Sequence, residues 1–306
     1  MRAIVNTPKG PDRIELRDGI VEPAPEPDQA LVAVEAVSIN RGELALMRNH
    51  PEGWRPGQDV AGVVERAARN GKGPGTGELV AALIEGAGWA ERVAVPIERL
   101  ARVPDGVDLE RAAGLPMVGL TGLALLRRCG PVIGRSMVVT GASGGVGSLV
   151  VQLGKLAGAE VVGVARAEHQ HWLSELGAVN VIPTIADAVG RFDFILESVG
   201  GSSLEQAIAH VRPGGRIICF GNSSAAKTEF DLFSFVGAEN ASVETFFSYR
   251  AMAPDEIGMN LAYLLGLVAN GVLEMRITPL NWKDAGSAVA LLEGRGTHGK
   301  IVLSIT

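Results

Sequence analysis

Residues 136–147 read Ser-Met-Val-Val-Thr-Gly-Ala-Ser-Gly-Gly-Val-Gly. The apolar run Met137–Val139 leads into glycines at 141, 144, 145 and 147, and apolar residues then recur at helical spacing as far as Ala157. This order predicts a strand, a tight turn and a helix. Glycines let the backbone turn sharply and approach a ligand, and the first N–H groups of a helix have no internal acceptor and carry the positive end of its dipole. A pyrophosphate satisfies both features, which makes the turn a candidate nucleotide site.

The glycine spacing of this turn is that of a dinucleotide-binding fingerprint, G-x-G-x-x-G, with alanine in place of the first glycine. A glycine-rich turn that only packs is the alternative. The predicted cofactor contacts in this stretch are Ala142, Ser143, Gly144, Gly145, Val146 and Gly147.

The same glycine-rich turn also resembles the cofactor turn of short-chain dehydrogenases, which carry a Tyr-x-x-x-Lys pair. The only two tyrosines, Tyr249 and Tyr263, are followed four positions later by Ala253 and Leu267. That interpretation therefore fails.

The composition and net charge of the chain argue against some classes of binding partner. The chain has 306 residues, 47% hydrophobic and 20% charged, with a net charge of −6 and no basic cluster, which argues against nucleic acid and anionic membranes. The N-terminus lacks a signal-peptide core and no run approaches a membrane span. The same charge leaves a small molecule as the expected partner. Two cysteines are too few for a disulfide framework, so we expect a cytoplasmic protein.

The first third contains short strand-like runs between Gly/Pro-rich turns, namely 3–5, 14–17, 29–39, 60–65, 79–83, 91–95 and 100–103, which predict a barrel-like β unit. Asp108 is a plausible cap for a helix that runs to Ala113. Beyond Met117, continuously apolar runs at 137–139, 161–164, 181–182, 192–196 and 217–220 predict a parallel, doubly wound sheet, with 243–249 as its last strand. The tail predicts an amphipathic helix after Pro254, a helix from Trp282 to Glu293 and a final strand, 300–305.

This order of parts resembles the medium-chain dehydrogenase/reductase superfamily, and several stretches resemble its zinc-free quinone oxidoreductase (zeta-crystallin-like) branch. The stretches are Ser38-Ile-Asn-Arg-Gly-Glu-Leu44, Gly57-Gln-Asp-Val-Ala-Gly-Val-Val64, Gly119-Leu-Thr-Gly122, Glu197-Ser-Val-Gly-Gly201, Phe220-Gly-Asn-Ser-Ser224 and Gly299-Lys-Ile-Val-Leu303. The resemblance implies an α/β fold: a GroES-like β-barrel substrate domain at 1–116, a Rossmann NADP-binding domain at 117–253, and a C-terminal segment, 254–306, that returns to the first domain. It also implies a homodimer, for which the expected edge strand offers Phe246, Phe247 and Tyr249.

No metal site is predicted. Where zinc-dependent relatives show Gly-His-Glu, this chain has Gly57-Gln58-Asp59, and no cysteine precedes residue 129. His169 and His171 are two apart on an expected helix and so face different ways, which favours a solvated pair over a pair of metal ligands.

Further cofactor residues follow the other strands of the predicted sheet. Arg166 comes after the second strand, where an NAD enzyme would place an acid, so it suits the 2′-phosphate of NADPH; a surface ion pair with Glu168 is the alternative. Val199, Gly221, Asn222 and Ser223 follow two later strands and are predicted to line the cofactor crevice, with ordinary turn chemistry as the alternative. By resemblance, Gly221 and Asn222 lie near the nicotinamide end and Thr121 near the nicotinamide ring.

Asn40 is the candidate catalytic residue, because by resemblance it faces the substrate. Its amide would donate to a quinone or enone oxygen as charge develops. Helix capping is the rival role, since asparagine is a preferred cap, and neighbouring Glu43 is expected to be solvated. The predicted function is an NADPH-dependent reductase that moves hydride to a quinone or an α,β-unsaturated carbonyl. An enone or enoyl-thioester reductase and a non-catalytic NADPH-binding protein are the alternatives.

Overall fold

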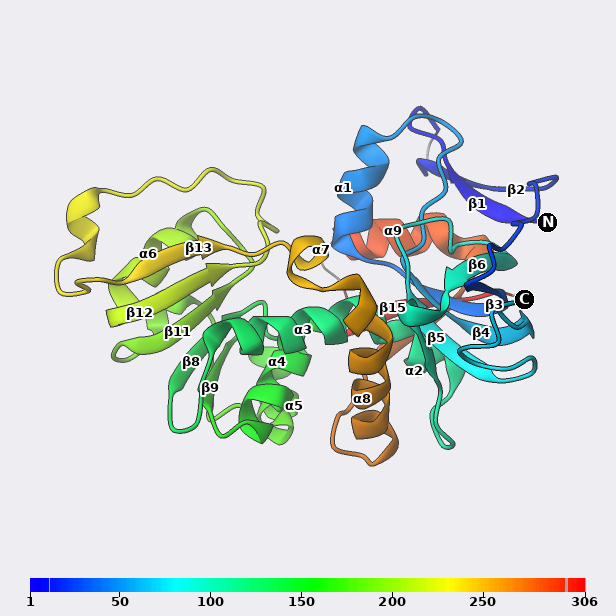
Figure 1. The fold of residues 1–306 in the computed structure, drawn as a ribbon. Coiled ribbons are helices and arrows are strands. Elements are labelled where there is room, and N and C mark those ends of the chain that lie inside the picture. The colour runs from blue at the N-terminus through cyan, green and yellow to red at the C-terminus, as the bar shows by residue number, and fades with distance from the viewer. Residues whose placement is uncertain (11, 295–296, 306) are drawn as a thin grey trace. The chain divides into compact units, whose positions relative to one another are not determined.

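The computed structural model describes residues 1–10, 12–294 and 297–305. The chain forms two compact units (Figure 1). Unit 1 comprises the described part of residues 1–120 and 253–306, and unit 2 comprises Thr121–Met252.

Unit 2 is built on a six-stranded sheet in the order β10-β9-β8-β11-β12-β13 (Figure 1). Every neighbouring pair is parallel, and the strand order reverses between β8 and β11. This arrangement confirms the predicted doubly wound Rossmann sheet and sets its ligand-binding crevice at the carboxyl ends of these two strands. The strands are β8 (Ser136–Thr140), β9 (Glu160–Val164), β10 (Asn180–Ile182), β11 (Phe192–Glu197), β12 (Val211–Cys219) and β13 (Ser242–Thr245).

Successive side chains of a strand point to opposite faces of the sheet, so these continuously apolar strands present apolar side chains on both faces. Helices cover both faces. Val138, Ile195 and Ile217 pack with residues of α6 (Ser202–His210) in one buried cluster. On the other face, Gly154 of α4 (Gly145–Leu156) lies against Val161, and α5 (Gln170–Leu176) follows β9. Helix α3 (Pro116–Cys129) precedes β8.

The predicted last strand, 243–249, is too long. Strand β13 ends at Thr245, and α7 (Ser248–Ala251) begins after Phe247. Phe246 is buried, so of the three aromatic residues expected at the sheet edge only Phe247 and Tyr249 are exposed.

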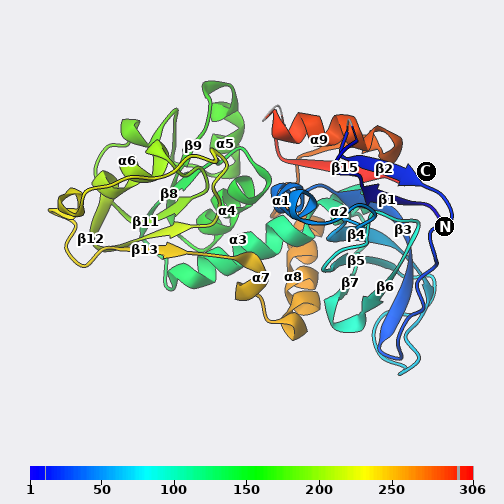
Figure 2. The ribbon, with the colours of Figure 1, turned by 90° about the horizontal axis from the view of Figure 1, so that it is seen from above.

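Unit 1 contains a seven-stranded, mostly antiparallel sheet in the order β14-β15-β3-β4-β5-β7, with β6 paired to β3, and a separate β1–β2 pair (Figure 2). It is the separate β domain expected beside the Rossmann sheet. Its strands are β1 (Ala3–Asn6), β2 (Ile14–Arg17), β3 (Gln29–Ser38), β4 (Asp59–Arg66), β5 (Leu79–Leu83), β6 (Arg92–Pro96), β7 (Leu100–Arg102), β14 (Ile277–Asn281) and β15 (Lys300–Ser304). Its helices are α1 (Arg41–Asn49), α2 (Leu109–Gly114), α8 (Ile257–Ala269) and α9 (Ala285–Glu293), and Asp108 caps α2 as predicted, accepting the Arg111 N–H at 2.7 Å.

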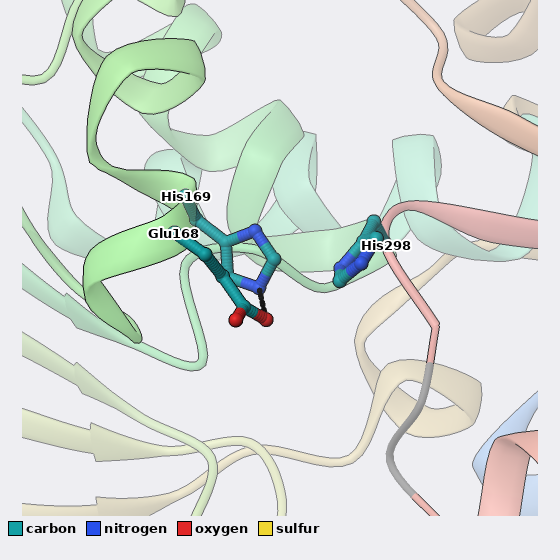
Figure 3. A group of neighbouring side chains, drawn as sticks. All are labelled: Glu168, His169 and His298. Atoms are coloured by element: carbon teal, nitrogen blue, oxygen red, sulfur yellow. Dashed lines mark ion pairs between the residues drawn. The ribbon is translucent and has the colours of Figure 1, made fainter.

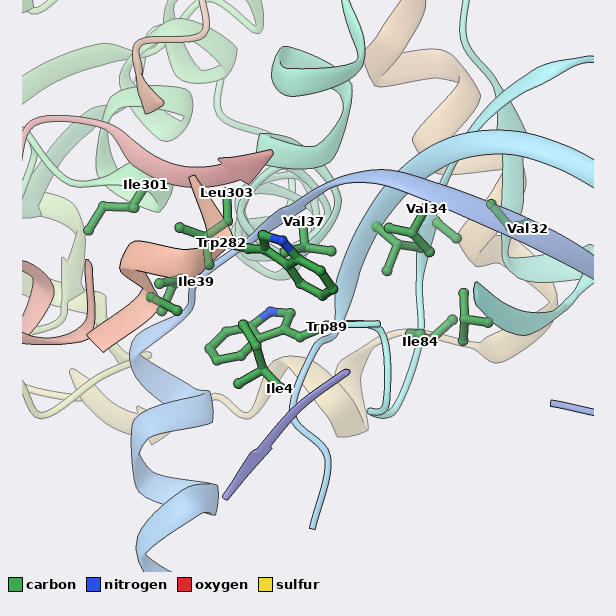
Figure 4. Packing of buried hydrophobic residues seen from close by; sticks show 14 of the residues in the cluster. Ile4, Val32, Val34, Val37, Ile39, Ile84, Trp89, Trp282, Ile301 and Leu303 are labelled. Carbon is green, nitrogen blue, oxygen red and sulfur yellow. The ribbon is translucent and has the colours of Figure 1, made fainter. Parts of the chain in front are cut away.

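The C-terminal strand belongs to the same sheet as the N-terminal strands. Strand β15 pairs antiparallel with β3, with Val302 opposite Ser38. The core beside this pairing holds Trp89 and Trp282, both buried (Figure 4). Consequently Lys300, the first residue of β15, is brought close to the end of β3.

Among the described residues, no helix is long and apolar enough to span a membrane.

Candidate functional site: a nucleotide edge and a buried charge cluster

The glycine turn after β8 is closely packed. Gly141 has a φ of +65°, the Gly144 N–H donates to the Gly141 carbonyl at 3.0 Å, and the Ala142 N–H donates to the Val164 carbonyl of β9 at 3.1 Å. A Cβ atom on Gly147 would lie 2.3 Å from the Gly141 oxygen. Glycine is therefore required at 147 for the helix to start this close to the strand.

The predicted cofactor residues of this turn divide into two kinds. Ala142 and Gly147 are buried and shape the turn, whereas residues 143–146 are partly exposed. Gly144 is the N-cap of α4 and has no side chain, so the backbone of this first turn is open to a ligand. A helix N-terminus of this kind holds a phosphate through its N–H groups and its dipole.

The loops after β11 and β12 are joined to each other. The Ser223 N–H donates to the Ser198 carbonyl at 3.0 Å, and the Ser224 N–H donates to the Val199 carbonyl at 2.8 Å. The structure thus brings Val199 and Ser223 together at the carboxyl edge of the sheet. Asn222 packs so closely on Gly200 that a Cβ there would meet its Oδ1 at 2.1 Å.

Arg166 lies directly after β9, at the same edge of the sheet. Its Nη2 is 3.2 Å from Glu168 Oε1, so the ion pair weighed as an alternative forms, but both side chains are more than half exposed. Exposed pairs contribute little, and a phosphate would compete with this one readily. Arg166 stays a predicted cofactor residue.

Thr121 is buried on α3. The next residue, Gly122, faces Leu149 and Val150 of α4, the helix that begins at the glycine turn. A nicotinamide contact of Thr121 stays a prediction.

His169 does not form the expected solvated pair with His171. His169 is buried and its Nε2 lies 3.4 Å from Glu168 Oε1 (Figure 3). His171 is exposed and pairs with Glu175. His298, also labelled in Figure 3, belongs to unit 1.

Glu197, the last residue of β11, is a polar residue of this edge that is not among the predicted site residues. Its side chain is fully buried. Its Oε1 accepts from Thr140 Oγ1 at 3.1 Å, the Val199 N–H at 3.0 Å and Ser203 Oγ at 2.8 Å, and its Oε2 accepts from the Gly200 N–H at 2.9 Å.

Unit 1 contains a second polar site, a buried charge cluster that consists of Asn40, Glu43, Asp59 and Lys300. Each side chain is less than 10% exposed. The Lys300 ammonium donates to the Ile39 carbonyl at 2.9 Å and to Asn40 Oδ1, and lies 3.2 Å from Asp59 Oδ2. One cation thus faces two carboxyl groups, an arrangement stable only if hydrogen bonds replace the lost water.

Asp59 links the cluster to three segments of the chain through hydrogen bonds. Its Oδ2 accepts from Ser38 Oγ at 2.6 Å and from Asn40 Nδ2 at 2.8 Å, and its Oδ1 accepts from the Met117 N–H at 2.8 Å, in the first turn of α3. Both oxygens are therefore occupied by protein donors.

Glu43 is fully buried, so the expectation that it is solvated was wrong. Its carboxylate accepts the backbone N–H groups of Asn40, Gly57 and Gln58 at 2.8–3.0 Å. Burial, and then the charge of Asp59, raise the pKa of Glu43 to about 7, against the opposite effects of Lys300 and of the Asn40 and Gln58 N–H donors. A proton therefore binds to this site near neutral pH.

Asn40 is the N-cap residue of α1, and its amide has a fixed orientation. Oδ1 faces the Lys300 ammonium, while Nδ2 donates to Asp59 Oδ2 at 2.8 Å and to Glu43 Oε2 at 3.3 Å. Because an amide nitrogen has only two hydrogens, both are directed at carboxyl groups. Of the two roles expected for Asn40, these contacts favour the structural one over donation to a substrate oxygen, and kinetics of Asn40 variants distinguish the two.

Comparison with known proteins agrees with this architecture. A family model described as "Zinc-binding dehydrogenase" matches residues 145–262. The chain is 28% identical to human quinone oxidoreductase over 96% of this chain and 94% of that protein. It is 30% identical to a chloroplastic NADPH-dependent alkenal/one oxidoreductase of Arabidopsis thaliana over 68% of this chain and 59% of that protein.

Among solved structures, the quinone oxidoreductase of Pseudomonas syringae pv. Tomato DC3000 is similar over 99% of both chains. Its TM-score is 0.89 and its sequence identity is 26%.

Proposed function

Since the chain belongs to the quinone oxidoreductase branch of the medium-chain dehydrogenase/reductase superfamily, we propose that it is an NADPH-dependent reductase of quinones or α,β-unsaturated carbonyls. The observation that carries this proposal is the glycine turn at the N-terminus of α4, next to the point where the strand order reverses. A dinucleotide binds at this position in a doubly wound sheet. Unit 2 would then be the cofactor domain and unit 1 the substrate domain.

The residues present fit NADPH. The partly exposed backbone of 143–146 would hold the pyrophosphate, and Arg166 would hold the 2′-phosphate. Val199, Gly221, Asn222 and Ser223 would line the cofactor crevice, with Gly221 and Asn222 near the nicotinamide end and Thr121 near the nicotinamide ring. When bound, the cofactor supplies a hydride for the substrate, while the chain's own residues fix the geometry and exclude water.

A quinone and an enone are similar acceptors, because each has a carbonyl conjugated to a carbon–carbon double bond. An enoyl-thioester is the nearest alternative substrate, and a panel of the three compounds separates them. A non-catalytic NADPH-binding protein is the alternative of a different class, since a cofactor domain alone does not ensure turnover. Consumption of NADPH in the presence of 1,4-benzoquinone decides between enzyme and binder.

We further propose that catalysis needs no zinc, although the matched family model is described as zinc-binding. That match begins at residue 145, beyond the segment in which zinc-dependent relatives show Gly-His-Glu. Here Gln58 occupies the histidine position, and both oxygens of Asp59 accept from protein donors. This arrangement leaves no ready set of three ligands in that segment.

A homodimer is part of the proposal, and β13 supports it. Among the described strands, β13 pairs with β12 alone, and Val243 in this strand and Phe247 shortly after it are exposed. An apolar edge strand favours pairing with a second copy. We also propose a cytoplasmic location, which the two cysteines support because both are free thiols and form no disulfide with each other.

A further inference from the structure

Glu197 lies where three elements of unit 2 meet. It ends β11, and its carboxylate accepts a hydroxyl from Thr140 at the end of β8 and another from Ser203 in the first turn of α6. β8 and β11 are the two strands between which the sheet order reverses. The carboxylate thus joins both strand ends that border the proposed cofactor crevice.

The partners of Glu197 are two hydroxyl groups and two backbone N–H groups, without a cation in the part of the chain that the structure describes. A buried carboxylate without a counter-charge is costly unless its oxygens are hydrogen-bonded. The buried Glu197 carboxylate is therefore stable only while its hydrogen-bond donors stay in place. Two of these donors, the N–H groups of Val199 and Gly200, belong to the loop that follows β11.

That loop has an unusual backbone. Gly200 and Gly201 have φ values of +74° and +55°, and the N–H groups of Val199 and Gly200 turn back toward the Glu197 side chain. Next to it, the Ser198 N–H donates to Thr140 Oγ1 at 2.8 Å and Ser198 Oγ donates to the Thr140 carbonyl at 2.9 Å. The loop is thus held at each residue from 198 to 200.

We infer that Glu197 is a positioning residue for the cofactor: its buried carboxylate folds the loop 198–201 into the shape that receives the nicotinamide half of NADPH. The inference rests on the proposed function, because it requires that NADPH binds at this edge. Glu197 itself is enclosed by protein and acts through Val199 and Gly200.

Replacement by glutamine tests this geometry. Three donors converge on Oε1, so the amide oxygen must occupy that position, and the amide NH₂ then faces the Gly200 N–H, donor against donor. The loop must move at Gly200. We expect Glu197→Gln to raise the Kd for NADPH about tenfold, the ratio that one hydrogen bond of about 1.4 kcal/mol produces. The KM for NADPH should rise while the KM for the quinone stays unchanged.

Asp193→Asn is the matched control. Asp193 is at the other end of the same strand, is mostly buried, and accepts from the N–H and hydroxyl of Ser136 in β8, both at 2.9 Å. If Glu197 only stabilised the sheet, both variants would lower the melting temperature and leave the Kd for NADPH unchanged. The inference requires a raised Kd in Glu197→Gln alone, measured by calorimetric titration well below the melting temperature.

Ser203→Ala removes one hydrogen-bond donor to Glu197 and keeps the carboxylate charge. It can therefore test the inference if Glu197→Gln does not fold. We expect it to raise the Kd for NADPH about threefold, a loss of roughly 0.7 kcal/mol. A wild-type protein that binds no NADPH would refute the proposed function. A wild-type protein that binds NADPH, with variants that are folded and bind it equally well, would refute the role of Glu197 alone.

Discussion

Asn40 Nδ2 lies 2.8 Å from Asp59 Oδ2, and this contact turns the amide of the candidate catalytic residue toward the interior of unit 1. The Lys300 ammonium on Oδ1 prevents the opposite orientation, because an NH₂ group there would face a cation. The cluster therefore competes with a substrate for the amide hydrogens of Asn40.

Asn40→Ala should act mainly on stability. It deprives Lys300, Asp59 and Glu43 of one partner each, and we expect the free energy of unfolding to fall by about 1–3 kcal/mol. The kcat of the folded variant with an enone should stay within about twofold of the wild type. Urea unfolding and steady-state kinetics measure the two effects.

Asn49→Ala is the control for this variant, because Asn49 is exposed on the same helix and, among the described residues, its side chain bonds to the Ala45 carbonyl alone. If Asn40 instead donates to the substrate in the transition state, its loss costs about 100- to 1000-fold in kcat. A loss of that size at unchanged stability would restore Asn40 to the mechanism. Asn40→Ser, which retains a cap but not the reach of the amide, should rescue stability only in part.

Stability should depend on pH through Glu43. The pKa of this group is about 7 in the folded chain against an ordinary value of 4.5, so its ionisation disfavours the folded state. The stabilisation by neutral Glu43 is fully present below the pKa that this group has in the unfolded chain. It is lost as the pH rises from about 4.5 to 7 and changes no further above that range.

The measurement is the free energy of unfolding of the wild type minus that of Glu43→Gln at several pH values. Titrating groups that are distant from Glu43 are common to both proteins and cancel. We expect this difference to decrease as pH rises, by at most about 1.4 kcal/mol per pH unit. A difference that increases with pH would mean that Lys300 and the N–H donors outweigh burial, contrary to the raised pKa.

Much of the fold was predictable because its signals are local. Strand 79–83 was predicted with its observed bounds, and the glycine turn was found from spacing alone. The strand 243–249 was overextended because Phe246, Phe247 and Tyr249 favour a β-strand, whereas the chain turns into α7 after Phe247.

The buried charge cluster was not predicted because its members are far apart in the chain. Lys300 and Asn40 are 260 positions apart, and a lysine at a strand end ordinarily suggests solvent. One local signal was present: glutamate three residues after Asn40 is the spacing of a capping box, and the Glu43 carboxylate does accept the Asn40 N–H. The enclosure of Glu197 likewise depends on which strands are neighbours.

NADPH should be preferred over NADH because of Arg166. A charge-assisted hydrogen bond to the 2′-phosphate is worth roughly 1.5–3 kcal/mol, or about ten- to a hundredfold in Kd. Arg166→Ala should erase most of this preference, whereas Glu168→Gln, which removes the charge paired with Arg166 and keeps the arginine, should preserve it. Arg212→Ala, at an exposed arginine bound to Asp193, is the matched control. Equal affinity of the wild type for both cofactors would exclude the assignment.

The protein should be a dimer through β13. Light scattering at micromolar concentration should give twice the monomer mass of 31.9 kDa. Val243→Lys places a charge at the exposed edge and should shift the protein to monomers without loss of the Rossmann fold. A monomer mass for the wild type would contradict the proposed assembly.

The most direct test of the proposed function is the rate of NADPH oxidation with 1,4-benzoquinone and with a simple enone, measured on protein exhaustively treated with a chelator and checked for zinc. We predict turnover that requires both the protein and the acceptor, is faster with NADPH than with NADH, and is unchanged by chelation. Folded protein that binds NADPH but oxidises it with neither acceptor would contradict the account.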